Sequence, residues 1–147
     1  TVAFLFSANP GEPPKPLDQI ASGGEISRVM LALKSLLRSS DDVPVLVFDE
    51  IDAGIGGETA HALANKLAAL AQGRQVLCVT HLAQIAAAAA RHVAVAKKVR
   101  SGRTLIHTTE LAGEDRVKEI ARMLGDSGMR ESHDLAQKLI QQAAGSG

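Results

Sequence analysis

Several common features are absent from this 147-residue sequence. Cys78 is the only cysteine, which excludes an internal disulfide framework and a zinc site built from several cysteines, and which suits a reducing cytoplasm. The 16 basic residues equal the 16 acidic residues, so no overall field favours nucleic acid, an anionic membrane or an acidic substrate. No apolar run approaches the roughly 20 residues of a membrane span, and the start lacks the basic flank of a signal peptide. We therefore expect a soluble, cytoplasmic protein.

A phosphate-binding loop is also absent. No Gly-x-x-x-x-Gly-Lys-[Ser/Thr] occurs in the sequence, so if the protein acts on a nucleoside triphosphate, the loop and lysine that cradle its β- and γ-phosphates must come from other polypeptide. The chain opens on Thr1 and passes at once into an apolar run, Val2 to Phe6, which suggests a piece of something longer. With 46% hydrophobic residues it can still bury a core as one globular domain.

The apolar pattern predicts alternating strands and helices. The prolines between Asn9 and Pro16 are expected to break regular structure, and the run Val43 to Phe48 is typical of a strand covered on both faces in a parallel sheet. The expected elements, in chain order, are a strand at 2–6, a helix from 26 to 37, a strand at 43–48, a helix through 63–70, a strand at 75–79, a helix at 82–90, a hairpin at 92–99 and 103–109, and two short helices, around 117–124 and from about 132.

This order indicates a layered α/β fold: a mostly parallel sheet with flanking helices, followed by a hairpin and two short helices. In such sheets, binding sites lie at the carboxyl ends of the strands. The first long helix has one apolar stripe, which we expect to be buried: Val29, Met30, Leu33, Leu36 and Leu37.

The stretch Ser22-Gly23-Gly24-Glu25 marks a helix start. Ser22 is a natural N-cap and Glu25 completes a capping box, but the two glycines are poor helix formers, each costing about 1 kcal/mol in a helix interior. One explanation is that bare backbone amides at a helix N-terminus can accept a phosphate. The other is a close packing contact that only glycine allows.

Polar residues follow two of the expected strands. Asp49 and Glu50 come directly after one strand, and Thr80 and His81 after the next. One carboxylate can hold hydrated Mg²⁺ while the other orients and deprotonates a water, an effect worth roughly 10²–10⁴-fold in rate. The imidazole of His81 can donate to a phosphate oxygen. The alternatives are that the two carboxylates form only a solvated acidic turn and that the histidine is only structural. Asp52 lies in a glycine-rich turn that can face a ligand or another subunit, or form a plain loop.

Basic residues gather at the expected hairpin tip. Lys97, Lys98, Arg100 and Arg103 either contact nucleic-acid phosphates or simply form a solvated tip, and charge alone does not decide between the two. The other histidines show no metal-ligand spacing and receive no role. They are His61, His92, His107 and His133.

In combination these motifs carry a family resemblance that spans nearly the whole chain. Four stretches resemble the C-terminal half of an SMC-like, ABC-type ATPase head from the branch that acts in bacterial DNA repair: FSANPGE at 6–12, ASGGE at 21–25, FDEIDAGIGG at 48–57 and VTH at 79–81. Ala21 and Glu25 stand where ABC transporters usually have leucine and often have glutamine, which favours the SMC-like branch.

The resemblance implies an ATPase that uses ATP and Mg²⁺ and acts on DNA. Ser22, Gly23 and Gly24 would hold the γ-phosphate of ATP bound to an opposite head. Asp49 would support Mg²⁺, and Glu50 would activate water. Asp52 would belong to the turn linking two heads, and His81 would touch the γ-phosphate. ATP would join two heads into a homodimer, and hydrolysis would release them. The phosphate-binding loop would lie in an N-terminal half, separated by a coiled coil, so this chain alone should be inactive.

Two other interpretations remain open. One is a non-catalytic assembly module. Glu50 argues against it, because assembly alone would not need a second carboxylate. The other is a self-sufficient metal-dependent hydrolase, for which no clear second cluster of ligands is present. An SMC-like or ABC ATPase outside DNA repair is a further alternative within the same class.

Overall fold

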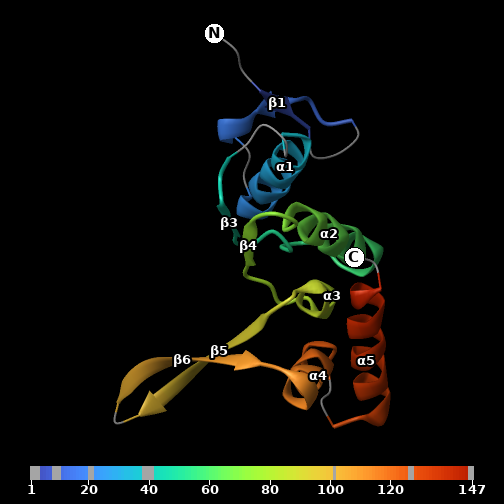
Figure 1. Cartoon of the computed structure of the whole chain (residues 1–147). Coiled ribbons are helices and arrows are strands. Elements are labelled where there is room, and N and C mark those ends of the chain that lie inside the picture. The colour runs from blue at the N-terminus through green and yellow to red at the C-terminus, as the bar shows by residue number, and fades with distance from the viewer. Residues whose placement is uncertain are drawn as a thin grey trace. The chain divides into compact units, whose positions relative to one another are not determined.

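The computed structural model describes residues 4–7, 11–19, 22–37, 42–100, 102–125 and 128–145. The chain divides into two compact units, residues 1–80 and 81–147, which are taken in turn. Helices and strands are mixed throughout, as the α/β class predicts (Figure 1). The described strands form three two-stranded sheets, of which one is parallel and two are antiparallel.

The first unit begins with a short antiparallel pair. β1 (Leu5–Phe6) pairs with β2 (Lys15–Pro16). We expected the proline-rich segment to be irregular, but its last two residues form a strand. Pro16 is tolerated because a two-stranded ladder has open edges, where a missing N–H is not needed. Residues 1–3 and 8–10, which belong to the expected strand and to the first motif, lie outside the described residues.

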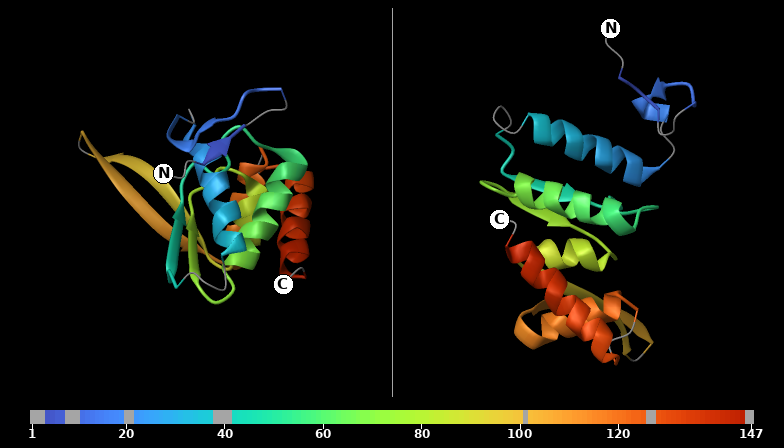
Figure 2. Two further views of the ribbon diagram at one scale, coloured as in Figure 1. Left: turned by 90° about the horizontal axis from the view of Figure 1, so that it is seen from above. Right: turned by 90° about the vertical axis from the view of Figure 1, so that its right-hand side faces the viewer.

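Helix α1 (Gly23–Leu36) begins where the capping box predicts. Ser22 is the N-cap, and its Oγ accepts a hydrogen bond from the backbone N–H of Glu25 at 3.2 Å. The expected burial of the whole apolar stripe is wrong, because Met30 and Leu37 are about half exposed and Leu36 is 80% exposed. The main packing neighbour of α1 is α2 (Gly57–Leu70), which lies beside it (Figure 2). The exposed side chains of the stripe are not covered by described residues.

The parallel pair lies at the centre of this unit. β3 (Val45–Phe48) runs beside β4 (Gln75–Cys78), with Phe48 opposite Cys78, so both carboxyl ends reach the same edge. Burial on both faces, as expected for this run, is not found. Leu46 and Phe48 are buried, whereas Val45 and Val47 are 41% and 66% exposed. Alternate residues point to opposite faces, and the described part of the unit covers only one of them.

The second unit is a helical cluster with a hairpin. α3 (Ala83–Ala88), α4 (Gly113–Met123) and α5 (Arg130–Ala144) share a small core of alanine, isoleucine and leucine side chains. Arg116 of α4 donates from Nη2 to the carbonyl oxygens of Ala86, Ala87 and Ala89 at 3.3, 3.0 and 2.6 Å. This side chain therefore caps the carboxyl end of α3, where the last carbonyl groups of a helix lack the full set of intrahelical hydrogen bonds.

The hairpin forms as predicted and is slightly longer. β5 (His92–Arg100) and β6 (Arg103–Leu111) pair antiparallel over nine residues each and extend away from the three helices of their unit (Figure 1). At its base, Arg91 donates two hydrogen bonds to the carboxylate of Glu110, at 2.7 and 2.6 Å. Within the described ranges, no helix has the length and apolar character that a bilayer crossing requires.

Candidate functional site

The start of α1 packs directly against the turn that follows β3. A methyl group added at Gly24 would lie 2.7 Å from the backbone oxygen of Glu50 and 3.0 Å from Cβ of Ala53. Gly24 is also buried. The close-packing explanation for this glycine is therefore confirmed, because no larger residue fits without moving backbone.

Gly23 differs from Gly24. It is exposed, and a methyl group there would meet only the carboxylate of Glu50, at 2.6 Å from Oε2. That carboxylate is the mobile end of a long side chain and can rotate away. Gly23 is thus exposed at the helix start whereas Gly24 is buried, and the half-buried Ser22 precedes Gly23. Ala21 lies outside the described residues.

Glu50 has an unusual backbone. Its φ angle is +55°, the left-handed region, and it is the single non-glycine residue with positive φ among those described. Such a conformation costs of the order of 1–3 kcal/mol and persists where the surroundings hold it in place. The backbone N–H of Glu50 donates to Oδ1 of Asp49 at 2.9 Å, and its carbonyl accepts from the N–H of Ala53 at 2.9 Å.

Two side chains of α1 hold the same turn. The hydroxyl of Ser27 donates to the carbonyl oxygen of Asp49 at 2.9 Å. Nη1 of Arg28 donates to the carbonyl oxygens of Ile51 and Ala53, both at 3.0 Å. Sequence reasoning missed both residues. A usable signal was present, since Gly24 and Arg28 are four residues apart and so share one face of the helix.

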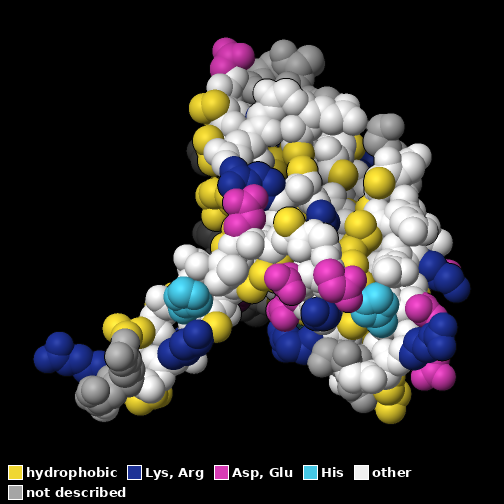
Figure 3. Space-filling model, turned by 60° about the horizontal axis from the view of Figure 1, so that its bottom comes forward, with side chains coloured by type: hydrophobic (Ala, Val, Ile, Leu, Met, Phe, Trp, Pro, Cys, Tyr) yellow, Lys and Arg dark blue, Asp and Glu magenta, His cyan; other side chains and the backbone are white. Residues whose placement is uncertain are grey.

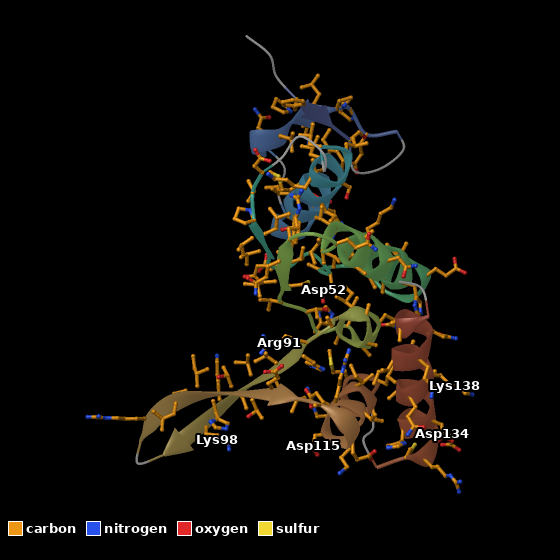
Figure 4. All side chains as sticks on the ribbon, viewed as in Figure 1. Asp52, Arg91, Lys98, Asp115, Asp134 and Lys138 are labelled. Atoms are coloured by element: carbon orange, nitrogen blue, oxygen red, sulfur yellow. The ribbon has the colours of Figure 1, made fainter. Side chains whose placement is uncertain are left out.

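Asp52 belongs to this turn, and its side chain is buried, with 3% of the residue exposed. Its carboxylate accepts a hydrogen bond from Oγ1 of Thr80 at 2.6 Å, so the carboxyl ends of β3 and β4 are joined there (Figure 4). Burial, and then the negative charges of Asp52 and Asp49, raises the pKa of the nearby Cys78 thiol to about 11. The predicted contact of Asp52 across two heads remains a prediction.

The carboxylates of Asp49 and Glu50 are both exposed. Among the described residues, no group of three His, Cys, Asp or Glu side chains comes together as a metal site, so the interpretation as a self-sufficient metal hydrolase finds no ligand set there. His81 is exposed and opens the second unit. The structure therefore brings the helix start and the Asp49–Glu50 pair together, and leaves the role of His81 as a prediction.

The basic residues of the hairpin are exposed. Lys97, Lys98 and Arg103 lie on β5 and β6, and no acidic residue occurs between residues 92 and 109. Figure 3 shows Lys or Arg side chains along this arm together with hydrophobic ones. The hydrophobic side chains are substantial, since Val95 and Ile106 are 67% and 68% exposed. The side chain of Arg100 lies outside the described part of the chain.

Comparison with known proteins places these features in a family. No protein-family model matches the sequence. Curated relatives do match: DNA repair protein RecN of Treponema pallidum is 55% identical over 144 residues, that of Deinococcus radiodurans 52% over 139, and that of Bacillus subtilis 45% over 145. The chain matches the C-terminal part of RecN. These three matches cover 97%, 95% and 97% of the chain, which spans about a quarter of the length of each RecN relative.

A solved structure supports the fold of this chain. It comes from work on ATP-driven dimerization and DNA-stimulated activation of SMC ATPases, and it aligns with a TM-score of 0.52 at 21% sequence identity. The alignment covers 86% of this chain and 83% of the other. The chain therefore has a fold similar to that of this SMC ATPase structure.

Proposed function

We propose that this chain is part of the ATP-binding and ATP-hydrolysing head of a RecN-type protein that acts in DNA double-strand-break repair and recombination. The relatives named DNA repair protein RecN and the SMC ATPase fold support this proposal. The observation that carries it is the packing of the α1 start against the Glu50 turn, where the exposed Glu50 carboxylate lies next to Gly23.

The α1 start takes the γ-phosphate of an ATP molecule held by a second head. Ser22 and Gly23 are not fully buried, and unpaired amides at a helix N-terminus attract negative charge. Gly24 contributes by letting the helix lie close to the turn. ATP bound in this way holds two heads together as a homodimer, and the loop that cradles its other phosphates belongs to the N-terminal half of the protein.

Asp49 supports Mg²⁺, most simply through water. A single exposed carboxylate fits this ion, which keeps several waters and takes one or two protein carboxylates plus phosphate oxygens. Mg²⁺ when bound neutralises charge that develops on the phosphates. The backbone N–H of Glu50 donates to Oδ1 of this carboxylate, and the Asp49 side chain is exposed.

Glu50 orients the attacking water and accepts its proton. His81 donates to the γ-phosphate. Asp52 keeps the turn that follows Glu50 in shape, because its buried carboxylate accepts a hydrogen bond from Thr80. These assignments divide the work between the two adjacent acidic residues, which point in different directions where the strand ends.

The N-terminal half of the protein is the first partner. The uncovered face of β3 and β4 presents Val45, Val47, Leu77 and Val79 at 41%, 66%, 47% and 62% exposure. A contiguous apolar surface on a sheet is typical of an interface.

DNA is the second partner. The protein acts in the cytoplasm, at the nucleoid. A non-catalytic assembly module, or an SMC-like ATPase outside repair, is the alternative function.

The test uses a full-length RecN protein that carries this sequence as its C-terminal part. Glu50→Gln should leave ATP binding intact, lower kcat by about 10²–10⁴-fold and prolong ATP-dependent pairing of heads, because the base is lost while the ligands remain. Glu58→Gln, an exposed glutamate in the first turn of α2, is the matched control. Equal, measurable turnover by Glu50→Gln and the parent would exclude Glu50 as the base. No turnover by the parent would favour the assembly module.

The 147-residue chain alone should bind ATP weakly and show no measurable turnover, and addition of the N-terminal part should restore both. Nucleotide binding by fluorescence and phosphate release measure the two quantities. Robust turnover by the chain alone would contradict the shared site.

A further inference from the structure

Ser27 and Arg28 connect α1 to the residues on either side of Glu50. Together their side chains donate to three carbonyl oxygens, those of Asp49, Ile51 and Ala53. Glu50 lies inside this span. Its backbone is therefore fixed from both sides by one helix rather than by the strand that leads into it.

The conformation of Glu50 makes such support necessary. A glutamate with φ of +55° reverts to an ordinary backbone conformation unless its neighbours prevent it. The tight contact of Gly24 with the Glu50 carbonyl allows α1 to come close enough for Ser27 and Arg28 to reach the turn. Glycine and arginine thus act on the same stretch of backbone from one face of the helix.

We propose that Ser27 and Arg28 are positioning residues that couple the start of α1 to the Glu50 carboxylate. A displacement of α1 carries the Asp49–Ala53 backbone with it, because the hydrogen bonds join the two. The inference rests on the proposed function: when the Ser22–Gly24 segment engages a phosphate from a second head, the shift of the helix sets the position of Glu50. Head pairing then controls hydrolysis through these hydrogen bonds.

Arginine suits this role better than lysine. One guanidinium nitrogen, Nη1, reaches two carbonyl oxygens that belong to residues two apart in the turn. A planar guanidinium holds its donors in fixed directions, whereas an ammonium group on a flexible stem does not. A lysine at this position should therefore keep the charge but lose part of the positional control.

The experiment measures ATP turnover by the full-length RecN protein carrying this sequence, with Arg28→Ala, Arg28→Lys and Ser27→Ala as test variants. Arg28→Ala should lower kcat about 10- to 100-fold while KM for ATP changes less than about threefold, because misplacement of a catalytic group by about 1 Å has effects of this size. Arg28→Lys and Ser27→Ala should give intermediate losses. Arg122→Ala, which removes an exposed arginine paired with Glu119, is the control and should keep kcat.

Turnover is divided by the amount of bound nucleotide, because only folded protein binds ATP. A variant that is merely unstable therefore shows a normal value. A normal kcat per bound nucleotide in Arg28→Ala would overturn the positioning role. If Arg28→Ala does not fold, Ser27→Ala decides in the same way. Glu50→Gln is measured in parallel: if it turns over normally, the proposed function fails, whereas stalled Glu50→Gln together with normal Arg28→Ala refutes the coupling alone.

Discussion

The contact between Gly24 and Glu50 gives a stability prediction with a built-in control. In Gly24→Ala, the new methyl group meets backbone at 2.7 Å and the Ala53 side chain at 3.0 Å, so α1 must move away from the turn. Overpacking of this kind costs about 1–3 kcal/mol, and alanine returns at most about 1 kcal/mol of helix propensity. We therefore expect a net loss of about 1–2 kcal/mol in the free energy of unfolding.

Gly23→Ala separates packing from propensity. Its methyl group meets only the Glu50 carboxylate, which can rotate, so the free energy of unfolding should be unchanged or higher by up to about 1 kcal/mol. Urea denaturation followed by circular dichroism measures both variants. A loss of 1–2 kcal/mol corresponds to a fall in Tm of about 2–8 °C for a chain of this size. If Gly24→Ala is as stable as Gly23→Ala, α1 does not pack on the turn as described.

Two further predictions concern single residues. Ser22→Arg in the full-length protein should abolish ATP-dependent pairing of heads while each head still binds ATP. Chromatography with and without ATP measures the pairing, and normal pairing by Ser22→Arg would refute contact in trans. Burial, and then the charge of Arg116, lowers the pKa of His92. Because the folded state binds this proton less tightly than the unfolded state, stability should fall as pH drops below about 6.5, and His92→Gln should flatten that slope in urea titrations.

The local features of the fold were predictable from the sequence. The capping box fixed the start of α1, because an N-cap depends on residues within one turn. The hairpin followed from two runs joined across Ser101-Gly102. The apolar run at Val45–Phe48 was correctly read as a strand, but its pattern records only that the side chains are apolar, and it cannot say which polypeptide covers them.

The candidate site was predictable in its residue types and not in its contacts. Asp49 and Glu50 followed from their place at the end of a strand. The burial of Asp52 did not, since an acidic residue in a glycine-rich turn has the composition of an exposed loop, and its partner Thr80 is 28 residues away. Arg28 was missed for the same reason, because its carbonyl partners lie 23 and 25 residues further along the chain.

The environment of Cys78 has a practical consequence for labelling. A thiol with a pKa of about 11 is a thiolate in only about one molecule in a thousand at pH 8, and the thiolate is the form that attacks maleimides. A cysteine introduced at an exposed position such as Lys98 would keep an ordinary pKa and react far faster. The chain therefore offers a background in which fluorescent or spin probes attach selectively to the hairpin without prior removal of the native thiol.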